Sequence, residues 1–260
     1  MHTVPFRLDG RVALITGAGS EHGIGRAIAH AFAEAGASVG LVDMDAAGAE
    51  RNAQQLQPKT EAYGTGVDVT NPESVKSAVQ RVEGTLGPVD VLVNCAGITR
   101  ATPIWETSLD EFDLVMNVNL RGGFVCLQAV LPGMMQRRHG RVIWISSIAG
   151  KQGGGVFGAA HYAASKAGVI GLCHAAARQL GPYGITSNAI APGLVTTDLL
   201  PRTGGEELAA RLRKAVEENT PVRRAATADD IAYAALFLAS DEASYVNGEI
   251  MDVNGGAYFD

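Results

Sequence analysis

Short apolar runs alternate with amphipathic helical patterns along the whole chain, and this alternation is the feature that most restricts its fold. Strands separated by helices lie parallel, in a sheet that helices cover on both faces. No repeat and no low-complexity linker divides the 260 residues. We therefore predict an α/β fold, with one domain over residues 1–260 built on a doubly wound parallel sheet of the Rossmann type. The predicted strands are 11–16, 38–42, 63–69, 89–94, 141–146, 185–191 and 250–253, and the predicted helices are 24–35, 46–56, 72–83, 109–135, 160–180 and 229–238.

The charge and the cysteines argue against several classes of partner. The net charge is −6, which disfavours binding to nucleic acid or to an anionic membrane surface. Three widely spaced cysteines without a CxxC pair predict free thiols, and the N-terminus has no signal pattern, so we expect a cytoplasmic protein. No apolar run approaches the roughly 18 residues of a membrane span. No histidine spacing matches a catalytic metal site, so we expect no metal.

A glycine-rich turn follows the first predicted strand and leads into the first predicted helix. Glycines there let the backbone approach a pyrophosphate, and the helix N-terminus offers free N–H groups. Asp43 ends the second predicted strand, where an acidic side chain can accept hydrogen bonds from ribose hydroxyls. Its carboxylate would repel the roughly −2 charge of a 2′-phosphate, which favours NAD over NADP; a solvated strand end or a helix cap is the alternative role. The turn residues predicted to hold the cofactor are Gly17, Gly19, Gly23, Ile24 and Gly25.

Tyr162 and Lys166 are four residues apart in a predicted helix, so they share one face of it. A free phenol has a pKa of about 10 and is a poor proton shuttle at neutral pH. We expect the Lys166 ammonium to lower the pKa of Tyr162 toward the range of a general acid–base. Alone, such a pair is more often one buried ring and one solvated amine, but here a nucleotide turn accompanies it.

The chain resembles the short-chain dehydrogenase/reductase family from residue 10 to residue 258. The resemblance rests on a series of motifs in order and at the family's spacing. They are the Thr16-Gly17 and Gly23-Ile24-Gly25 turn, Asp68-Val69, Asn94-Cys95-Ala96-Gly97, Asn119-Leu120, Ser147, Tyr162 with Lys166, and Pro192-Gly193 with Thr197.

The resemblance implies a role for each of these positions. Tyr162 would exchange a proton with the substrate oxygen, Ser147 would hydrogen-bond that oxygen, and Lys166 would support the phenolate and bind the nicotinamide ribose. Asn119 would hold a water that relays protons from Lys166. A turn at Asp68, a strand-end hydrogen bond at Asn94 and an ordinary turn at 192–193 stay open as alternatives. The implied cofactor contacts are Asp68, Val69, Asn94, Ala96, Gly97, Tyr162, Lys166, Pro192, Gly193, Val195 and Thr197.

Two features depart from the family pattern. Five residues, 18–22, separate Gly17 from Gly23, where three are usual. We expect Glu21 and His22 to bulge outward over the ribose edge, because phosphate binding needs backbone donors rather than a negative side chain. Ser146 also competes with Ser147 for the catalytic position, and strand alternation allows only one of them to face the cleft; we predict Ser147.

The substrate side of the site is less constrained. Gln152, Val156 and Leu194 are expected to line the pocket, and residues 194–218 to form a substrate lid. Trp105 could close the opposite side, although burial in the core is the commoner fate of a lone tryptophan. His161 is read as a helix-face or capping histidine rather than a second acid–base group.

The main functional hypothesis is an NAD-dependent dehydrogenase or reductase acting on a small or medium secondary alcohol or ketone. The alternative within enzymes is a 3-oxoacyl-thioester reductase; such relatives usually use NADPH, and no basic patch for an acyl carrier is evident. A non-catalytic dinucleotide sensor is the alternative of another class. The resemblance also implies a homotetramer, with the helices 109–135 and 160–180 at one interface.

Overall fold

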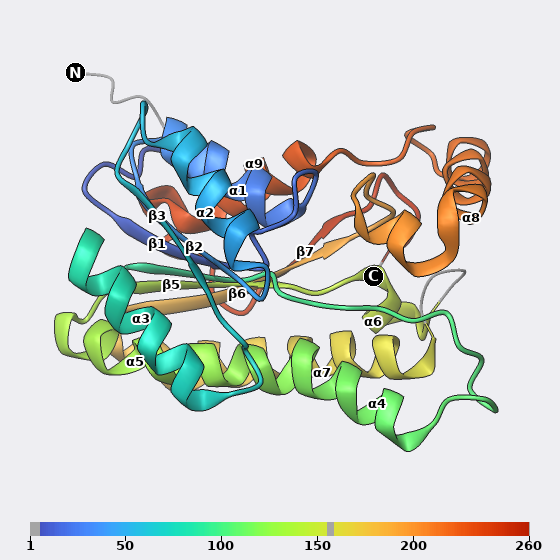
Figure 1. Ribbon diagram of the computed structural model, residues 1–260, viewed down its shortest axis with the longest axis horizontal. Coiled ribbons are helices and arrows are strands. Elements are labelled where there is room, and N and C mark those ends of the chain that lie inside the picture. The colour runs from blue at the N-terminus through green and yellow to red at the C-terminus, as the bar shows by residue number, and fades with distance from the viewer. Residues whose placement is uncertain (1–5, 155–158, 260) are drawn as a thin grey trace.

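The computed structural model describes residues 6–154 and 159–259. Within them, seven parallel strands form one sheet in the order β3-β2-β1-β4-β5-β6-β7, with helices on both faces (Figure 1). The predicted α/β doubly wound fold of the Rossmann type is confirmed. The strands are β1 (Val12–Thr16), β2 (Ser38–Asp43), β3 (Ala62–Gly66), β4 (Val91–Asn94), β5 (Gly140–Ile145), β6 (Ile185–Pro192) and β7 (Ile250–Val253).

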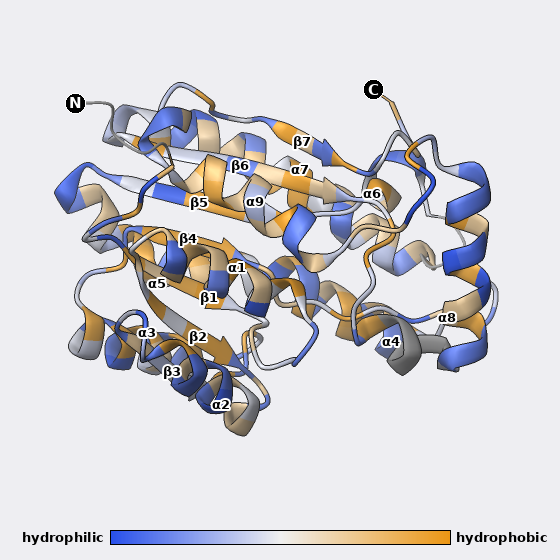
Figure 2. Ribbon diagram, turned by 90° about the horizontal axis from the view of Figure 1, so that it is seen from above, coloured by the Kyte–Doolittle hydropathy of each residue, from blue (hydrophilic) through white to orange (hydrophobic). Residues whose placement is uncertain are grey.

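Two hydrophobic cores lie on the two faces of the sheet. Strand residues alternate between them because successive side chains point to opposite faces: Ala13 and Ile15 of β1 belong to one core, and Leu14 belongs to the other. The first core lies under α1 (Ile24–Glu34), α2 (Ala46–Leu56) and α9 (Ala228–Ala239). The second lies under α3 (Pro72–Leu86), α5 (Gly122–Arg137) and α7 (Ala160–Leu180). Strands buried on both faces are mainly apolar, and Figure 2 shows this hydrophobic character over much of the sheet, interrupted by polar positions.

Local signals explain where several helices begin. Asn71 caps α3 by accepting hydrogen bonds from the backbone N–H groups of Glu73 and Ser74, and Pro72 occupies the first helical position. Thr227 and Asp230 form a capping box at α9. The remaining helical segments are α4 (Leu109–Met116), a π-helical turn η1 (Asn117–Arg121), α6 (Ile148–Gln152), η2 (Gly181–Tyr183), α8 (Leu199–Asn219) and η3 (Asp241–Ala243).

Three sequence predictions differ from the structure. The helix predicted over 109–135 is divided into α4 and α5 by η1, which holds one extra residue per turn. The strand predicted over 63–69 ends at Gly66, and Val69 instead packs against Gly122 of α5. Two helices, α6 and α8, were not predicted. A non-helical Gly205, with φ +78°, interrupts α8 and obscures its periodicity.

The stretch Leu109–Arg137 is long and apolar enough to cross a membrane, judged by length and composition alone. In the structure, α5 packs against α3 and the sheet, and its buried residues include Val125, Val130 and Met134. A core helix that contacts both a sheet and a neighbouring helix has the same composition. This packing accounts for the apolar character of α5.

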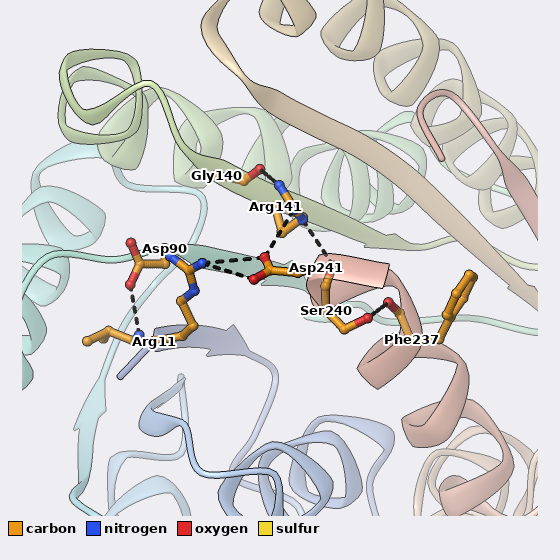
Figure 3. Close-up of polar contacts among 8 residues, drawn as sticks. Arg11, Asp90, Gly140, Arg141, Phe237, Ser240 and Asp241 are labelled. Atoms are coloured by element: carbon orange, nitrogen blue, oxygen red, sulfur yellow. Dashed lines mark hydrogen bonds and ion pairs between the residues drawn. The ribbon is translucent and has the colours of Figure 1, made fainter. Parts of the chain in front are cut away.

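At the amino-terminal edge of the sheet, Arg141 of β5 is a buried cation (Figure 3). Its guanidinium lies 3.5 Å from the carboxylate of Asp241, and it donates to the carbonyls of Gly140 at 3.1 Å and Ser240 at 3.4 Å. Arg11 reaches the same carboxylate at 3.4 Å. Burial lowers the pKa of Arg141, and the Asp241 carboxylate opposes that effect. These contacts compensate the buried charge and join β5 to the segment that follows α9.

Candidate active site

The strand order reverses between β1 and β4, and the carboxyl ends of these strands border a cleft. Thr16 joins the two strand ends. Its Oγ1 accepts hydrogen bonds from the backbone N–H groups of Cys95 and Ala96, both at 3.0 Å, and donates to the carbonyl of Val93 at 3.4 Å. In Figure 2 the strand arrows point toward α8. The cavity is lined both by residues at strand ends, such as Ile145 and Pro192, and by residues of this helix. This edge is where an open α/β sheet binds its ligand.

The glycine-rich turn has no room for side chains at its two ends. Gly17 has φ +70°, and a Cβ at this position would lie 2.8 Å from the backbone of Ala96. A Cβ at Gly25 would lie 2.4 Å from the carbonyl oxygen of Gly17. The turn therefore folds tightly onto itself and leads directly into α1, whose first N–H groups have no acceptor within the helix. This geometry fits the pyrophosphate of a dinucleotide, as predicted for these glycines.

The two extra residues of the turn, Glu21 and His22, are exposed, so the expected outward bulge is confirmed. The turn is held from two sides. Asn52 of α2 donates from Nδ2 to the carbonyls of Ala18 at 2.8 Å and Ser20 at 3.2 Å. On the other side, the hydroxyl of Ser20 donates to the carboxylate of Asp198 at 2.6 Å. The bulge therefore contacts the residue that precedes α8.

Asp43 stands at the end of β2 beside the glycine-rich turn, where the sequence placed it. Its Oδ2 accepts a hydrogen bond from the N–H of Gly19 at 2.9 Å, and its Oδ1 accepts one from the N–H of Asp45 at 2.9 Å. The residues between Asp43 and α2 are Met44 and Asp45, and neither is basic. The segment from Asp43 to Asp45 thus carries two carboxylates and no basic residue.

Three other predicted cofactor positions make contacts within the protein. Asp68 accepts hydrogen bonds from the N–H of Thr70 at 2.9 Å and from its hydroxyl at 2.7 Å, the turn-forming role left open by the sequence. Val69 belongs to the second core. The side chain of Asn94 is buried at the end of β4, and neither of its polar atoms has a hydrogen-bond partner among the described residues. Adenine contacts at 68–69 stay a prediction.

Tyr162 lies in the first turn of α7 and lines the cavity. Ser147 lines the cavity with it, and its side chain acts to lower the pKa of the Tyr162 phenol. Ser147 also caps α6 by accepting from the N–H of Ala149 at 3.1 Å. The hydroxyl of Ser146 is engaged elsewhere, because it donates to the backbone carbonyl of Lys166 at 2.8 Å. The contacts therefore agree with the choice of Ser147 over Ser146.

Lys166 lies one turn further along α7, and its side chain is buried beside that of Tyr162. Its Nζ is 5.7 Å from the centroid of the Tyr162 ring and donates to the carbonyl of Ile145 at 2.8 Å. Asn119, in the π turn η1, donates from Nδ2 to the carbonyl of Ile98 at 2.9 Å and accepts from the N–H of Ile98 at 2.8 Å. Ser147, at the start of α6, and Tyr162 and Lys166 of α7 line the same cavity. Asn119 lies near Lys166 but does not line the cavity: a Cβ built on Gly97 would be 3.4 Å from both Asn119 Oδ1 and Lys166 Nζ.

Burial sets the proton affinities of this group. It raises the pKa of Tyr162, although the Ser147 hydrogen bond acts in the opposite direction. It lowers the pKa of Lys166 to about 8. The expected net lowering of the Tyr162 pKa is wrong for this arrangement, because burial outweighs the effects that lower it. Tyr162 is consequently a protonated donor at neutral pH.

A cavity of about 660 Å³ extends from these residues to α8. Gln152 and Leu194 line it as predicted, whereas Val156 lies outside the described residues. The predicted cofactor positions that line it are Ile24, Gly97, Tyr162, Lys166, Pro192, Gly193, Val195 and Thr197. The predicted lid segment, 194–218, contributes further lining residues from α8: Leu199, Leu212, Ala215 and Val216, with Asn219 just beyond the predicted range. Sequence reasoning did not name these individual positions, although residues 212, 215, 216 and 219 have the spacing of one helix face. The role of this segment as a lid stays a prediction.

Two aromatic or ionisable side chains near the site do not enter it. Trp105 is 80% exposed, so it neither closes the pocket nor joins the core. His161 is fully buried, with Nε2 3.4 Å from the carboxylate of Glu111 in α4. It does not line the cavity, which agrees with its interpretation as a helix-face residue.

Comparisons with known proteins give one consistent result. Residues 17–258 match a family described as enoyl-(acyl carrier protein) reductase. The chain is 40% identical to the 3-oxoacyl-[acyl-carrier-protein] reductase FabG of Escherichia coli over 255 residues, 97% of this chain and 99% of that protein. It is 41% identical to the corresponding reductase of Vibrio cholerae over 253 residues, again 97% and 99%. The crystal structure of levodione reductase is similar at a TM-score of 0.89 and 35% identity, covering 97% of this chain and 100% of that one.

These relatives cover nearly the whole chain. The seven-stranded parallel sheet and the series of sequence motifs agree with membership of one family. The chain belongs to the short-chain dehydrogenase/reductase family, whose members are oxidoreductases that use a nicotinamide cofactor.

Proposed function

We propose that this protein reduces the ketone of a 3-oxoacyl thioester to the secondary alcohol, with Tyr162 as the proton donor. The observation that carries the proposal is that Ser147, Tyr162 and Lys166 line one cavity, which also reaches Ile24 at the end of the glycine-rich turn. The relatives named 3-oxoacyl-[acyl-carrier-protein] reductases support this substrate class. Their names favour it over a small free alcohol, the main hypothesis from the sequence.

The side chains have distinct tasks in this reaction. A bound nicotinamide supplies or accepts the hydride. Ser147 donates a hydrogen bond to the ketone oxygen, where negative charge develops. Tyr162 transfers its proton to that oxygen, which its raised pKa permits because the phenol stays protonated at neutral pH. Lys166, with a pKa of about 8, is still largely protonated at pH 7 and can supply positive charge beside the phenolate.

The wall of the cavity opposite Tyr162 suits an acyl chain. Leu199, Leu212 and Val216 of α8 line it together with Val222, so its surface there is apolar. An alkyl chain that leaves water for such a surface gains about 0.8 kcal/mol per buried CH₂ group. The apolar wall therefore favours a substrate that carries hydrocarbon next to its reacting ketone.

A second candidate is a free secondary alcohol or cyclic ketone, which the structural relative named levodione reductase supports. Reduced-nicotinamide absorbance separates the two, with acetoacetyl thioesters of coenzyme A and N-acetylcysteamine set against cyclic ketones, vicinal diols and sugars. We expect the thioesters to give the highest kcat/KM. Preference for a free alcohol or ketone would overturn the thioester proposal. Tight binding of a nicotinamide dinucleotide without turnover of any substrate would indicate a sensor instead.

We further propose NAD(H) as the preferred cofactor, on the strength of the Asp43 carboxylate beside Gly19. Changing Asp43→Asn keeps an acceptor of the same shape and removes the charge that would repel a 2′-phosphate. The ratio of kcat/KM for NADH to that for NADPH should fall by about tenfold, the scale of one charge interaction near a protein surface. Asp45→Asn is the matched control, since Asp45 caps α2. A wild-type preference for NADPH would contradict this proposal.

The predicted homotetramer is likewise a proposal. Phe112 and Leu114 of α4 and Phe124 of α5 are large apolar side chains that remain about 40% exposed in the single chain, and burial against a second copy would remove them from water. Light scattering should give four times the protomer mass, and a monomer would contradict the assembly.

The three cysteines are free thiols, which fits the proposed cytoplasmic location.

A further inference from the structure

The carboxylate of Asp198 bridges the glycine-rich turn and the segment that leads into α8. Its Oδ2 accepts hydrogen bonds from the hydroxyl of Ser20 at 2.6 Å and from the N–H of His22 at 3.0 Å. Its Oδ1 lies 3.1 Å from Nδ1 of His22. Three contacts therefore connect one side chain to a turn that lies more than 170 residues earlier in the sequence.

These contacts replace the ordinary role of an aspartate at this position. Asp198 is the residue immediately before α8, where an aspartate side chain commonly accepts hydrogen bonds from the first N–H groups of the helix. Here it makes no such bond. Burial tends to raise the pKa of Asp198, but the hydrogen bonds from Ser20 and His22 outweigh it, so the pKa is lowered and the carboxylate is charged at neutral pH.

On the turn side, the bridge uses Ser20 and His22 of the segment that is longer than the family's usual turn. His22 supplies two of the three contacts. Ser20 is itself anchored, because Asn52 binds its carbonyl at 3.2 Å. Its hydroxyl therefore offers a fixed donor, whereas Glu21 is exposed and makes no contact with Asp198 in the described interactions.

On the other side, Asp198 stands between two groups that line the cavity. Thr197 precedes it, and the lining residues of α8 begin with Leu199 directly after it. The segment just before is held to the body of the protein, since Thr196 donates from its N–H to the carbonyl of Ala226 at 2.9 Å. A displacement of Asp198 would therefore move Thr197 and the first turn of α8 more readily than the strand β6 behind them.

We propose that Asp198 is a positioning residue that latches α8 to the phosphate turn, closing the site over the bound dinucleotide and slowing its release. The proposal rests on the proposed function only in that the turn binds a nicotinamide dinucleotide. The turn leads into Ile24, and Ile24 and Thr197 both line the cavity, so the bridge ties two parts of the cavity lining together. Retention of the cofactor and the shape of the substrate cavity thereby depend on the same carboxylate.

The test is the rate at which NADH dissociates, measured by stopped-flow fluorescence as excess NAD displaces it. Asp198→Asn removes the charge, and Ser20→Ala removes one donor from the other side of the bridge. Hydrogen bonds to a charged group are stronger than neutral ones, and partial exposure weakens them, so we expect NADH to leave about tenfold faster from either variant. The double variant should be little faster than Asp198→Asn alone, because both changes disrupt one bridge.

Glu207→Gln is the matched control, since it removes an exposed carboxylate of α8 that does not line the cavity, and it should leave the rate unchanged. The melting temperature of each variant establishes that a faster rate is not general unfolding. Limited trypsin digestion at Arg211 and Arg213 of α8 gives a second reading: NADH should protect these sites in the wild type and protect them less in Asp198→Asn. Equal dissociation rates and equal protection would overturn the latch.

Slower dissociation from Asp198→Asn would also overturn it, because the carboxylate would then be competing with the anionic dinucleotide. A failure of the proposed function is distinguishable from both results. If the wild type binds neither NADH nor NADPH, the nicotinamide function and the latch fall together. If it binds NADH but reduces no thioester, the substrate class fails and the latch is judged by the dissociation rates alone.

Discussion

Replacing Tyr162 with phenylalanine should lower kcat by about 10²- to 10⁴-fold, the usual contribution of a positioned general acid. The change removes one hydroxyl and keeps the ring that Lys166 faces at 5.7 Å. Lys166 retains its hydrogen bond to Ile145, because that bond does not involve the phenol. The Kd for NADH should therefore stay within about twofold of the wild type, and the measurement is a comparison of kcat with NADH affinity by fluorescence titration.

Tyr183→Phe serves as the control for this substitution. Tyr183 lies in η2, does not line the cavity and should tolerate loss of its hydroxyl without a change in turnover. Turnover by Tyr162→Phe equal to that of the wild type would remove Tyr162 from the chemistry. A parallel loss of NADH affinity would instead show that the phenol mainly holds the cofactor.

Replacing Gly25 with alanine should weaken NADH binding by more than a hundredfold. The added Cβ would lie 2.4 Å from the carbonyl oxygen and 2.9 Å from the carbonyl carbon of Gly17, and both are backbone atoms. The turn would have to open to accommodate the methyl group, which displaces the N–H groups that approach the pyrophosphate. Isothermal titration with NADH measures the loss, and circular dichroism verifies that the sheet and helices remain.

Gly84→Ala is the matched substitution, since it adds the same methyl group to a glycine of α3. A Cβ there meets no atom within 4 Å. Because alanine is about 1 kcal/mol more favourable than glycine inside a helix, this variant should be slightly more stable and should bind NADH normally. Full NADH affinity in Gly25→Ala would show that the turn does not contact the pyrophosphate as proposed.

The sequence predicted the fold well where a segment carries both a regular pattern and clear ends. The helix Ala160–Leu180 and the strand Ile250–Val253 were predicted to the residue. Prediction was poorest where one backbone feature overrides the pattern. Val67 and Val69 continue an apolar run, yet the strand ends at Gly66, because Asp68 closes a turn with Thr70. Apolar residues alone do not mark that turn.

The candidate site was predictable in its membership and less so in its energetics. Motif spacing identifies Tyr162, Lys166 and Ser147, but the pKa of Tyr162 depends on burial, which the spacing does not report. The bridge between His22 and Asp198 also lies beyond sequence reasoning. It joins residues that are distant in the chain, and no sequence motif links His22 to Asp198. The extra length of the turn was visible, but the residue that it reaches was not.

The π turn at Asn117–Arg121 changes the direction in which side chains leave a continuous helix. One part of the helix can therefore pack against the sheet while another directs a side chain toward the cleft. Each residue of an α-helix advances the direction of its side chain by about 100°, so a single surplus residue rotates everything after it relative to everything before it. Beyond the turn, Val125 and Val130 face the sheet. Within it, Asn119 is directed at the backbone of Ile98 on the cleft side. A strictly regular α-helix through the same segment could place either Val125 and Val130 against the sheet or Asn119 against Ile98. It would rotate the other side chains away from their contacts.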